Sequence, residues 1–366
     1  MANNNVKAIH DFGQSIWLDF LDRKIMKSGE LTRLIAEDGI CGVTSNPSIF
    51  EKAITESADY SKDIIELSQK ADSNERIFFS LCVKDIQAAA DLFIKVYEES
   101  NGQDGYVSLE VSPRLARDTE GTISQARMLW KEVGRKNVMI KIPATAEGIP
   151  AIRQCISEGI NINITLLFGL DRYQEVIEAY LSGLEARLSA KQSITSISSV
   201  ASFFLSRIDV LLDPMLVEKG LDSLKGESAT AAAKKAYSIY QDVFTSSRFK
   251  KLEKEGARRQ RLLWASTGTK DPSYSDVKYV ESLIGPETIN TVPLETLEAF
   301  RDHGKPGNNL EQNSDQASKV LDVLKKNNID MAHISDQLEK EGVEKFNKAY
   351  ANLLGAIEKQ KTKALA

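Results

Sequence analysis

The 366-residue chain is 42% hydrophobic and 27% charged, and its formal net charge is −5. A chain of this length can bury a large core, either as one large α/β domain or as two domains of ordinary size. Its basic residues are dispersed rather than clustered, which disfavours binding to nucleic acid or to a membrane surface. An anionic substrate would need a local basic pocket, because the overall field would not attract it.

The three cysteines are far apart in the sequence and form no CxxC pair: Cys41, Cys82 and Cys155. This spacing predicts reduced thiols in a reducing compartment rather than a disulfide framework or a zinc site. The first five residues lack the basic and apolar regions of a signal peptide. No apolar run approaches the roughly 18 residues that a membrane span needs. We therefore expect a soluble, cytoplasmic protein.

In chain order, short apolar segments alternate with longer amphipathic, charge-rich segments. Eight short segments are expected to be strands: 15–19, 42–46, 106–111, 138–144, 162–168, 194–199, 262–266 and 288–293. Helical patterns separate them, for example over 75–100 and 171–190. Eight strand–helix repeats are typical of an α/β protein with a (β/α)8 TIM barrel. An open doubly wound sheet is the alternative, but no GxGxxG motif follows any of these strands.

Two segments fall outside this alternation. Residues 218–261 are helical in pattern and highly charged, and we expect them to form an insertion between the sixth and seventh strands. After about residue 305 the chain is polar, and it then becomes helical at 341–360. Because no low-complexity linker precedes this tail, we expect a single domain over 1–366, with 305–366 as a C-terminal helical extension packed on the barrel.

Polar side chains recur on one face of five expected strands. Alternate residues of a strand point to opposite faces, and one face of a barrel strand meets the interior. The expected interior positions, mostly near the carboxyl ends of the strands, include Ser15, Asp19, Thr44, Asn46, Ser108, Glu110, Lys141, Asn163 and Thr165. Active sites of TIM barrels lie at this rim. The pattern predicts a catalytic mouth.

Lys141 lies inside the apolar strand pattern that ends at Pro143. A lysine whose amine reaches solvent at a strand edge is the alternative, but an unpaired ammonium is costly in a strand that is covered on both sides. Burial favours the neutral amine, which is the nucleophilic form. Such an amine attacks ketones to give a Schiff base, an electron sink for breaking the neighbouring carbon–carbon bond. The residues alone predict chemistry like that of a class I aldolase.

Asp19 and Glu110 are the candidate carboxylates. Each could simply cap the helix that follows its strand. On the same face as Lys141, however, they supply the two proton-transfer groups that Schiff-base chemistry needs, one for the substrate hydroxyl and one for water during imine formation and hydrolysis.

Arg207, after SFFLS, and Lys270, after STGT, are candidate phosphate-binding residues. The alternative is that both are ordinary surface cations. A metal site is poorly supported, because the histidines are scattered and none shares an expected interior face: His10, His303 and His333.

The most specific motifs, in chain order, are IWLDFLDR, GVTSNPSIFEKAI, VSLEVSPRLA, VMIKIPAT, INITLLF and SFFLSRID. Over nearly its whole length the chain resembles the transaldolase family. The segment SGELTRLIAEDGICGVTSNP is similar to a longer bacterial subgroup, some members of which are fused to a glucose-6-phosphate isomerase. The chain ends too early to carry that second enzyme. The resemblance implies a TIM barrel of class I aldolase type, with Lys141 as the Schiff-base lysine and Asp19 as the acid/base.

The same resemblance implies roles for the other side chains. Glu110 and Thr165 would hold the catalytic water, and Phe204 would close the pocket. Substrate hydroxyls would bind to Asn46, Asn163 and Ser202, and the phosphate to Arg207. Many family members carry a second phosphate-binding arginine after the seventh strand, where this chain reads STGTKD, so Lys270 or backbone amides would substitute.

The expected reaction moves a dihydroxyacetone unit from sedoheptulose 7-phosphate or fructose 6-phosphate to glyceraldehyde 3-phosphate or erythrose 4-phosphate, in the pentose phosphate pathway and without a metal or organic cofactor. A fructose-6-phosphate aldolase is the closest alternative. Those enzymes are shorter and typically have glutamine and tyrosine at the positions of Glu110 and Phe204. A non-catalytic barrel that acts as a binding or scaffold protein is a further alternative, but it does not explain why an ionisable residue, Lys141, lies inside the fourth strand. The sequence leaves monomer and homodimer open.

Overall fold

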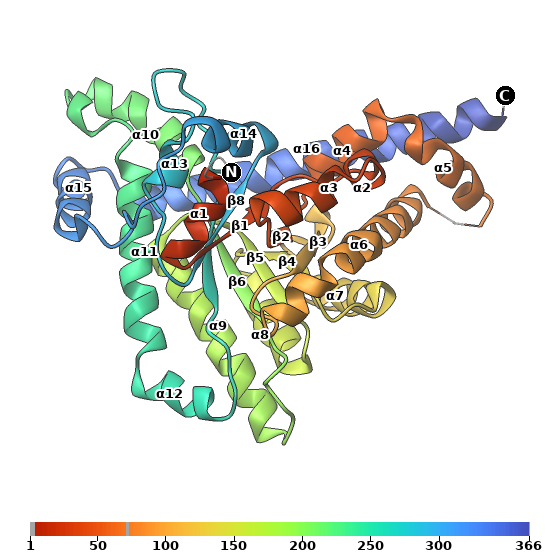
Figure 1. Ribbon diagram of the computed structural model, residues 1–366, viewed down its shortest axis with the longest axis horizontal. Helices are drawn as coiled ribbons and strands as arrows, with labels where there is room; N and C mark the ends of the chain where they lie inside the picture. Colours follow the sequence, from red (N-terminus) through yellow and green to blue (C-terminus); the bar gives the residue numbers. More distant parts are fainter. Residues whose placement is uncertain (1–3, 71–72, 366) are drawn as a thin grey trace.

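A computed structural model of the chain describes residues 4–70 and 73–365. Eight parallel strands close into a barrel in sequence order, with β8 pairing β1. The strands occupy the centre of the molecule, surrounded by helices (Figure 1). Their bounds are β1 Gln14–Leu18, β2 Gly42–Val43, β3 Tyr106–Glu110, β4 Val138–Pro143, β5 Ile162–Leu167, β6 Ser199–Phe204, β7 Arg261–Ala265 and β8 Thr288–Val292. The predicted (β/α)8 TIM barrel is confirmed.

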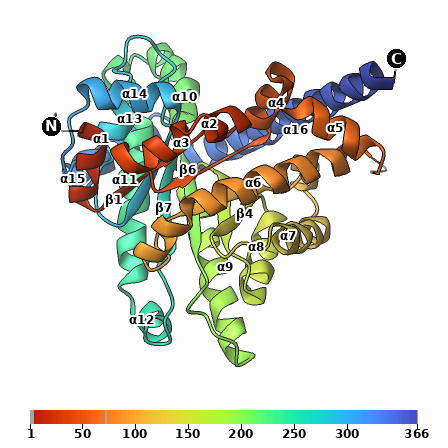
Figure 2. The same cartoon turned by 45° about the vertical axis from the view of Figure 1, so that its right-hand side comes forward.

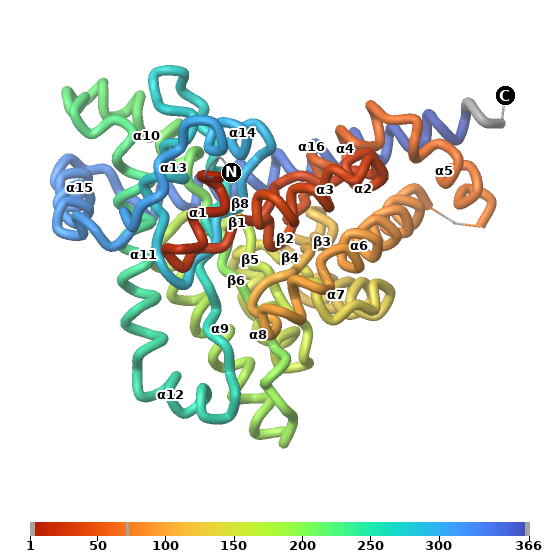
Figure 3. The backbone as a smooth tube through the Cα atoms, viewed as in Figure 1, coloured from red at the N-terminus to blue at the C-terminus, as the bar shows by residue number. Residues whose placement is uncertain are grey.

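Helices follow the strands around the barrel, and α1 lies beside α14 where the two ends of the repeat meet (Figure 3). The N-terminal half contains α1 Asn5–Ala8, α2 Arg23–Lys27, α3 Glu30–Arg33, α4 Pro47–Glu56, α5 Ser61–Ser68, α6 Asn74–Glu99, α7 Thr119–Val133 and α8 Gly148–Glu158. The C-terminal half contains α9 Leu170–Ser189, α10 Ser206–Glu218, α11 Ser228–Phe244, α12 Ser247–Lys254, α13 Lys278–Glu281, α14 Leu294–His303, α15 Ser314–Lys326 and α16 Met331–Leu365. No helix in the described ranges is long and apolar enough to cross a membrane.

The expected sixth strand at 194–199 is wrong. Residues 194–198 form turns and irregular backbone, in which Ile197 N–H donates to the carbonyl of Ile194. The apolar side chains there recur at a spacing of three and are buried by a turn, not by a pleated strand. Ladder pairing begins only at Ser199, opposite Ile162. The expected second strand is also too long, because regular pairing ends at Val43.

The segment 218–261 does supply helices between β6 and β7, namely α11 and α12. Although the segment 218–261 as a whole is highly charged, α11 is rich in alanine and is not an insertion on the surface. Its buried face includes Tyr237, Tyr240 and Phe244, and it contacts α9 and α10. α11 therefore belongs to the helical layer of the barrel.

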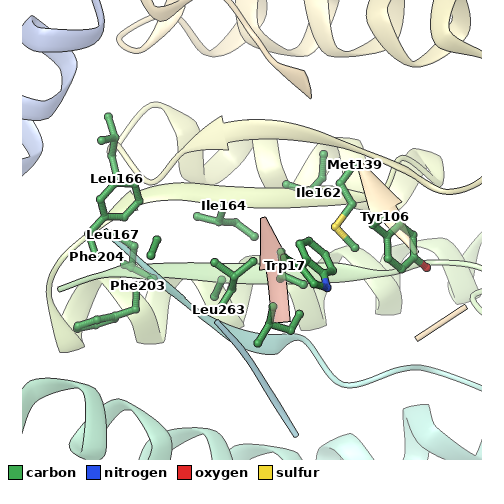
Figure 4. Packing of buried hydrophobic residues seen from close by; sticks show 14 of the residues in the cluster. Trp17, Tyr106, Met139, Ile162, Ile164, Leu166, Leu167, Phe203, Phe204 and Leu263 are labelled. Atoms are coloured by element: carbon green, nitrogen blue, oxygen red, sulfur yellow. The ribbon is translucent and has the colours of Figure 1, made fainter. Parts of the chain in front are cut away.

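Buried apolar side chains pack along the strands of the barrel (Figure 4). Among them, Trp17, Tyr106 and Met139 lie close together, and the ring centres of Trp17 and Tyr106 are 6.3 Å apart. Gly42 leaves room for this packing, because a Cβ at that position would lie 2.7 Å from the Trp17 ring. The polar groups follow in the same strands, at the carboxyl-terminal half, so a packed apolar layer lies beneath them.

The C-terminal helix α16 is 35 residues long and extends well beyond the helix expected at 341–360. It runs beside α4 and α5 (Figure 2) and also contacts α6, α10 and the end of β5. These are elements at or after the carboxyl ends of strands, so α16 lies along the rim that carries the polar side chains.

Candidate active site

The strand register places three predicted site residues in one row. Glu110 on β3 pairs with Lys141 on β4, and Lys141 pairs with Asn163 on β5. Lys141 Nζ lies 3.5 Å from Glu110 Oε2 and donates a hydrogen bond of 3.0 Å to the carbonyl oxygen of Ser45. The side chains of Lys141 and Glu110 are only 5% and 6% exposed. A primary amine is thus held inside the barrel next to a carboxyl group.

Burial raises the pKa of Glu110 to about 7, although the positive charge of Lys141 acts in the opposite direction. Glu110 Oε2 and Thr165 Oγ1 are both buried and make no hydrogen bond to the described residues. A carboxyl group with a pKa near 7 can both donate and accept protons at neutral pH. These two oxygen atoms are therefore suited to hold a water molecule or a substrate hydroxyl.

Asp19 follows β1 and ends a chain of hydroxyl groups. Thr44 Oγ1 donates to Asp19 Oδ1 at 2.7 Å, and Thr44 Oγ1 also lies 2.7 Å from Thr291 Oγ1. Because the Thr44 proton points to Asp19, Thr291 must donate to Thr44. Burial raises the pKa of Asp19, opposed by the charge of Lys141 and the Thr44 hydrogen bond. This series of hydroxyl groups orients one oxygen of Asp19, and the other oxygen makes no hydrogen bond to the described residues.

Asn163 and Ser202 hold each other in place. Ser202 Oγ donates to Asn163 Oδ1 at 2.7 Å, and Asn163 Nδ2 donates to Ser108 Oγ at 2.9 Å. All three side chains are buried. This network fixes the orientation of the Asn163 amide and of the Ser202 hydroxyl, the groups predicted to contact substrate hydroxyls.

Asn46 has a local role that the sequence analysis missed. Its Oδ1 accepts from the backbone N–H groups of Ser48 and Ile49, which makes it the N-cap of α4, with Pro47 at the first helical position. The Asn-Pro pair before an apolar run was a signal for this cap. Since its oxygen is engaged, only the Asn46 amide nitrogen remains to donate to a substrate.

Arg207 lies at the start of α10, beside the barrel mouth. Its guanidinium is 5.3 Å from the ring centre of Phe204, which in turn lies 5.3 Å from Phe168. Burial lowers the pKa of Arg207, with the charges of Glu110 and Asp19 opposing. Within residues 4–70 and 73–365, no carboxylate oxygen lies within 4.0 Å of this guanidinium. A half-buried guanidinium without an anionic partner is a ready phosphate-binding group.

Lys270 is exposed on the segment after β7, where its Nζ turns back toward Gly268. No contact joins it to the buried row of Glu110, Lys141 and Asn163. The site also contains side chains that the sequence analysis did not single out, notably Thr291. Alternation places Thr291 on the same face of β8 as Ile289, but only the pairing of β8 with β1 brings it to Thr44.

The histidines lie away from this site. His10 contacts the carbonyl oxygen of Gly39, and the exposed His303 lies between Asp276 and Asp302. In the described part of the chain, no three His, Cys, Asp or Glu side chains come together in a way that could hold a metal ion.

The chain matches the family model described as transaldolase/fructose-6-phosphate aldolase over residues 16–357. It is 47% identical to a transaldolase from Trichodesmium erythraeum and 46% identical to one from Saccharopolyspora erythraea, in each case over 98% of both chains. A protein from Mycolicibacterium smegmatis with the same name is 45% identical, again over 98% of both chains. The buried lysine, the two carboxyl groups and these full-length similarities agree: the chain belongs to the transaldolase/fructose-6-phosphate aldolase family and is an enzyme of its transaldolase branch.

Proposed function

We propose that this transaldolase transfers a dihydroxyacetone unit between sugar phosphates through a Schiff base on Lys141. The donor is a ketose phosphate such as sedoheptulose 7-phosphate or fructose 6-phosphate. The acceptor is an aldose phosphate such as glyceraldehyde 3-phosphate or erythrose 4-phosphate, which places the reaction in the pentose phosphate pathway. The observation that carries this proposal is the 3.5 Å approach of Lys141 Nζ to Glu110 Oε2 in a buried barrel interior.

The chemistry begins at Lys141. Its neutral amine attacks C2 of the ketose, and water leaves to give an iminium ion. Asp19 removes the proton of the C4 hydroxyl, the C3–C4 bond breaks, and its electron pair moves into the iminium to form an enamine. The aldose phosphate departs. The enamine then attacks the carbonyl carbon of an acceptor aldose, Asp19 returns a proton to the new alkoxide, and hydrolysis frees Lys141.

Glu110 and Thr165 serve the steps that gain or lose water. Glu110 Oε2 and Thr165 Oγ1, which make no hydrogen bond to the described residues, fit a water molecule beside Lys141, and the raised pKa of Glu110 allows it to exchange a proton with that water. Asn163, Ser202 and the Asn46 amide bind substrate hydroxyls. Arg207 binds the phosphate, with Lys270 as a further cation at the mouth.

A fructose-6-phosphate aldolase is the second candidate, since the family contains both activities. It would have to protonate the enamine and release free dihydroxyacetone. Phe204, which is buried beside Arg207, has no proton to donate. This residue favours transfer over release.

We further propose that the chain works as one domain over 1–366 in the cytoplasm, that neither a metal nor an organic cofactor takes part, and that the active unit is a monomer or a homodimer. The packing of α16 along the barrel supports the single domain. A sedimentation experiment would decide the oligomeric state.

Borohydride trapping tests the Schiff base. Reduction during incubation with fructose 6-phosphate should add a dihydroxyacetone-derived mass to the peptide that contains Lys141. Lys141→Ala should lose both the adduct and the turnover. Lys136→Ala, at an exposed lysine near the start of the same strand, should keep both. An adduct on another lysine, or turnover by Lys141→Ala, would disprove the assignment.

A further inference from the structure

Three cations meet at the mouth of the barrel without anionic partners. They are Arg207 at the start of α10, Lys270 on the segment after β7, and Lys345 on α16. Burial lowers the pKa of Lys345, and the positive charges of Arg207 and Lys270 lower it further. Across the described ranges, no carboxylate oxygen lies within 4.0 Å of any of the three, whereas the buried Arg23 is paired with Asp63 and Asp85. The negative charges of Glu110, Asp19 and Glu341 act on Arg207 only from beyond ion-pair distance, so the cluster is only partly balanced.

Arg207 is enclosed by α16 as well as by the barrel. Its guanidinium lies 5.8 Å from the ring centre of Phe346, and a Cβ at Gly342 would lie only 3.3 Å from its Nη1. The same Cβ would lie 2.8 Å from Leu166, at the end of β5, so glycine allows α16 to approach the rim closely. Residues three and four apart share a helix face. Lys345 is three residues from Gly342, about 60° around the helix, so its exposed side chain lies at the edge of the face that Gly342 and Phe346 present to Arg207.

The position of α16 is fixed by polar contacts on both sides of these residues. Glu339, which is 6% exposed, forms ion pairs with Arg117 at 2.9 Å and with Arg172 at 3.7 Å. Eleven residues further along, Tyr350 donates to Glu75 at 2.6 Å. Arg117, Arg172 and Glu75 thus hold α16 on the barrel, and Lys345 lies between Glu339 and Tyr350 in the sequence.

We propose that Lys345 is a phosphate-binding residue, through which the C-terminal helix completes the phosphate site formed by Arg207 and Lys270. Like charges held close together repel one another, and a phosphate dianion relieves that repulsion while gaining charge-assisted hydrogen bonds. Arg207 offers a planar fork, and Lys345 offers a flexible ammonium that follows the phosphate of donors and acceptors of different length. This inference rests on the proposed function and gives the C-terminal extension a role in it.

The test compares Lys345→Met with two other variants. Lys345→Arg keeps the charge. Lys340→Met removes another exposed lysine of α16. Because an α-helix turns about 100° per residue, Lys340 lies more than 120° around the helix from Lys345. Steady-state transfer is measured with fructose 6-phosphate and with fructose as donors, and inorganic phosphate is used as an inhibitor. Lys345→Met should raise KM for fructose 6-phosphate about tenfold and leave kcat nearly unchanged, because it removes one charge-assisted hydrogen bond to the phosphate.

The proposal also predicts the behaviour of phosphate as an inhibitor, of fructose as a donor and of the two control variants. Inhibition by inorganic phosphate should weaken by a similar factor, the reaction of fructose should stay the same, and Lys345→Arg and Lys340→Met should behave like the wild type. If Lys345→Met behaves like Lys340→Met, or slows both donors equally, Lys345 does not bind phosphate. Calorimetric titration with inorganic phosphate tests the phosphate-binding role of Lys345 separately from the proposed transferase function. A wild type that fails to transfer would refute the function, yet weaker phosphate binding by Lys345→Met would still support the site.

Discussion

Lys141 and Glu110 face each other across neighbouring strands at 3.5 Å, with almost no exposure of either side chain to solvent. The barrel brings them together because a register pair in parallel strands points both side chains to the same face. Burial disfavours the carboxylate form of Glu110 and raises its pKa to about 7. A carboxyl group that can donate and accept a proton at neutral pH suits a neighbouring lysine whose substrate adduct must lose and regain water during turnover.

The first prediction concerns the stability contributed by Glu110. Because burial raises its pKa from the usual 4.5 to about 7, the folded chain keeps the carboxyl proton in a pH range where the unfolded chain has lost it. This contribution is complete below the unfolded pKa and is lost as pH rises through 7. Glu110→Gln does not titrate. Relative to wild type, its free energy of unfolding should therefore rise between about pH 5 and about pH 8, by at most about 3 kcal/mol.

Urea unfolding of both proteins at the two pH values measures this difference. The control is Glu344→Gln, at an exposed glutamate of α16, which should show no such change with pH. In the pH profile of kcat/KM, Glu110→Gln should also lose an ionisation near neutrality. A difference in stability that is independent of pH would mean that Glu110 stays ionised in the folded protein.

A second prediction separates imine formation from bond cleavage. Asp19→Asn keeps the shape of the side chain and an oxygen that can accept from Thr44, but it removes the acid/base. Transfer should fall by a factor of roughly 10² to 10⁴. Lys141 should still react, so borohydride with fructose 6-phosphate should trap the uncleaved ketose phosphate rather than a three-carbon unit. If the variant traps nothing, Asp19 is needed to form the imine.

Much of this site can be predicted from the sequence, because its side chains occupy alternate positions along β-strands. Alternation alone places Lys141, Glu110, Asn163 and Thr165 on one face, and strand order places them at one rim. Thr291 was missed because a threonine in an apolar strand is ordinary by itself. It becomes informative only when β8 closes next to β1 and brings it within 2.7 Å of Thr44.

The contribution of α16 could not be predicted in the same way. Gly342 and Phe346 have no local feature that points to Arg207, more than 130 residues earlier in the chain. Their role depends on a long-range approach that is set by the pairing of Glu339 with Arg117 and Arg172. The misplaced sixth strand has a similar origin, because Ile194 and Ile197 are as apolar as strand residues but are buried by a turn.

A third prediction concerns metals. Prolonged treatment with a chelator, followed by assay in metal-free buffer, should leave transfer unchanged, because Lys141 supplies the electron sink that a metal ion would otherwise provide. Activity that falls on chelation and returns with zinc or another divalent cation would favour a metal-dependent aldolase.

A fourth prediction separates transfer from aldol cleavage. Phe204→Tyr adds a phenol beside the proposed enamine, and a phenol can act as a general acid. Release of dihydroxyacetone should rise relative to transfer. Phe204→Leu is the control, since it removes the ring stacked on Arg207 without adding a proton donor. If both variants release dihydroxyacetone equally, loss of the ring rather than the phenol is responsible, and a wild type that releases as fast as it transfers is an aldolase.

The last prediction concerns Arg207, whose guanidinium lies 5.3 Å from the ring centre of Phe204 and 5.8 Å from that of Phe346. These cation–π contacts restrict the planar fork, which can bind two phosphate oxygens. The phosphate is remote from the breaking bond, so its binding energy anchors and orients the sugar chain. Arg207→Ala should therefore cost on the order of 2–5 kcal/mol in kcat/KM for phosphorylated substrates and almost nothing for fructose. Arg207→Lys should recover only part of the loss, because a lysine lacks the planar fork.

Lys270→Ala should show the same selectivity with a smaller loss, since Lys270 is exposed and solvent screens its charge. Steady-state kinetics with fructose 6-phosphate and fructose provide the comparison. Equal losses for the two donors would show that Arg207 supports the fold of the rim, and the phosphate would then have to bind elsewhere.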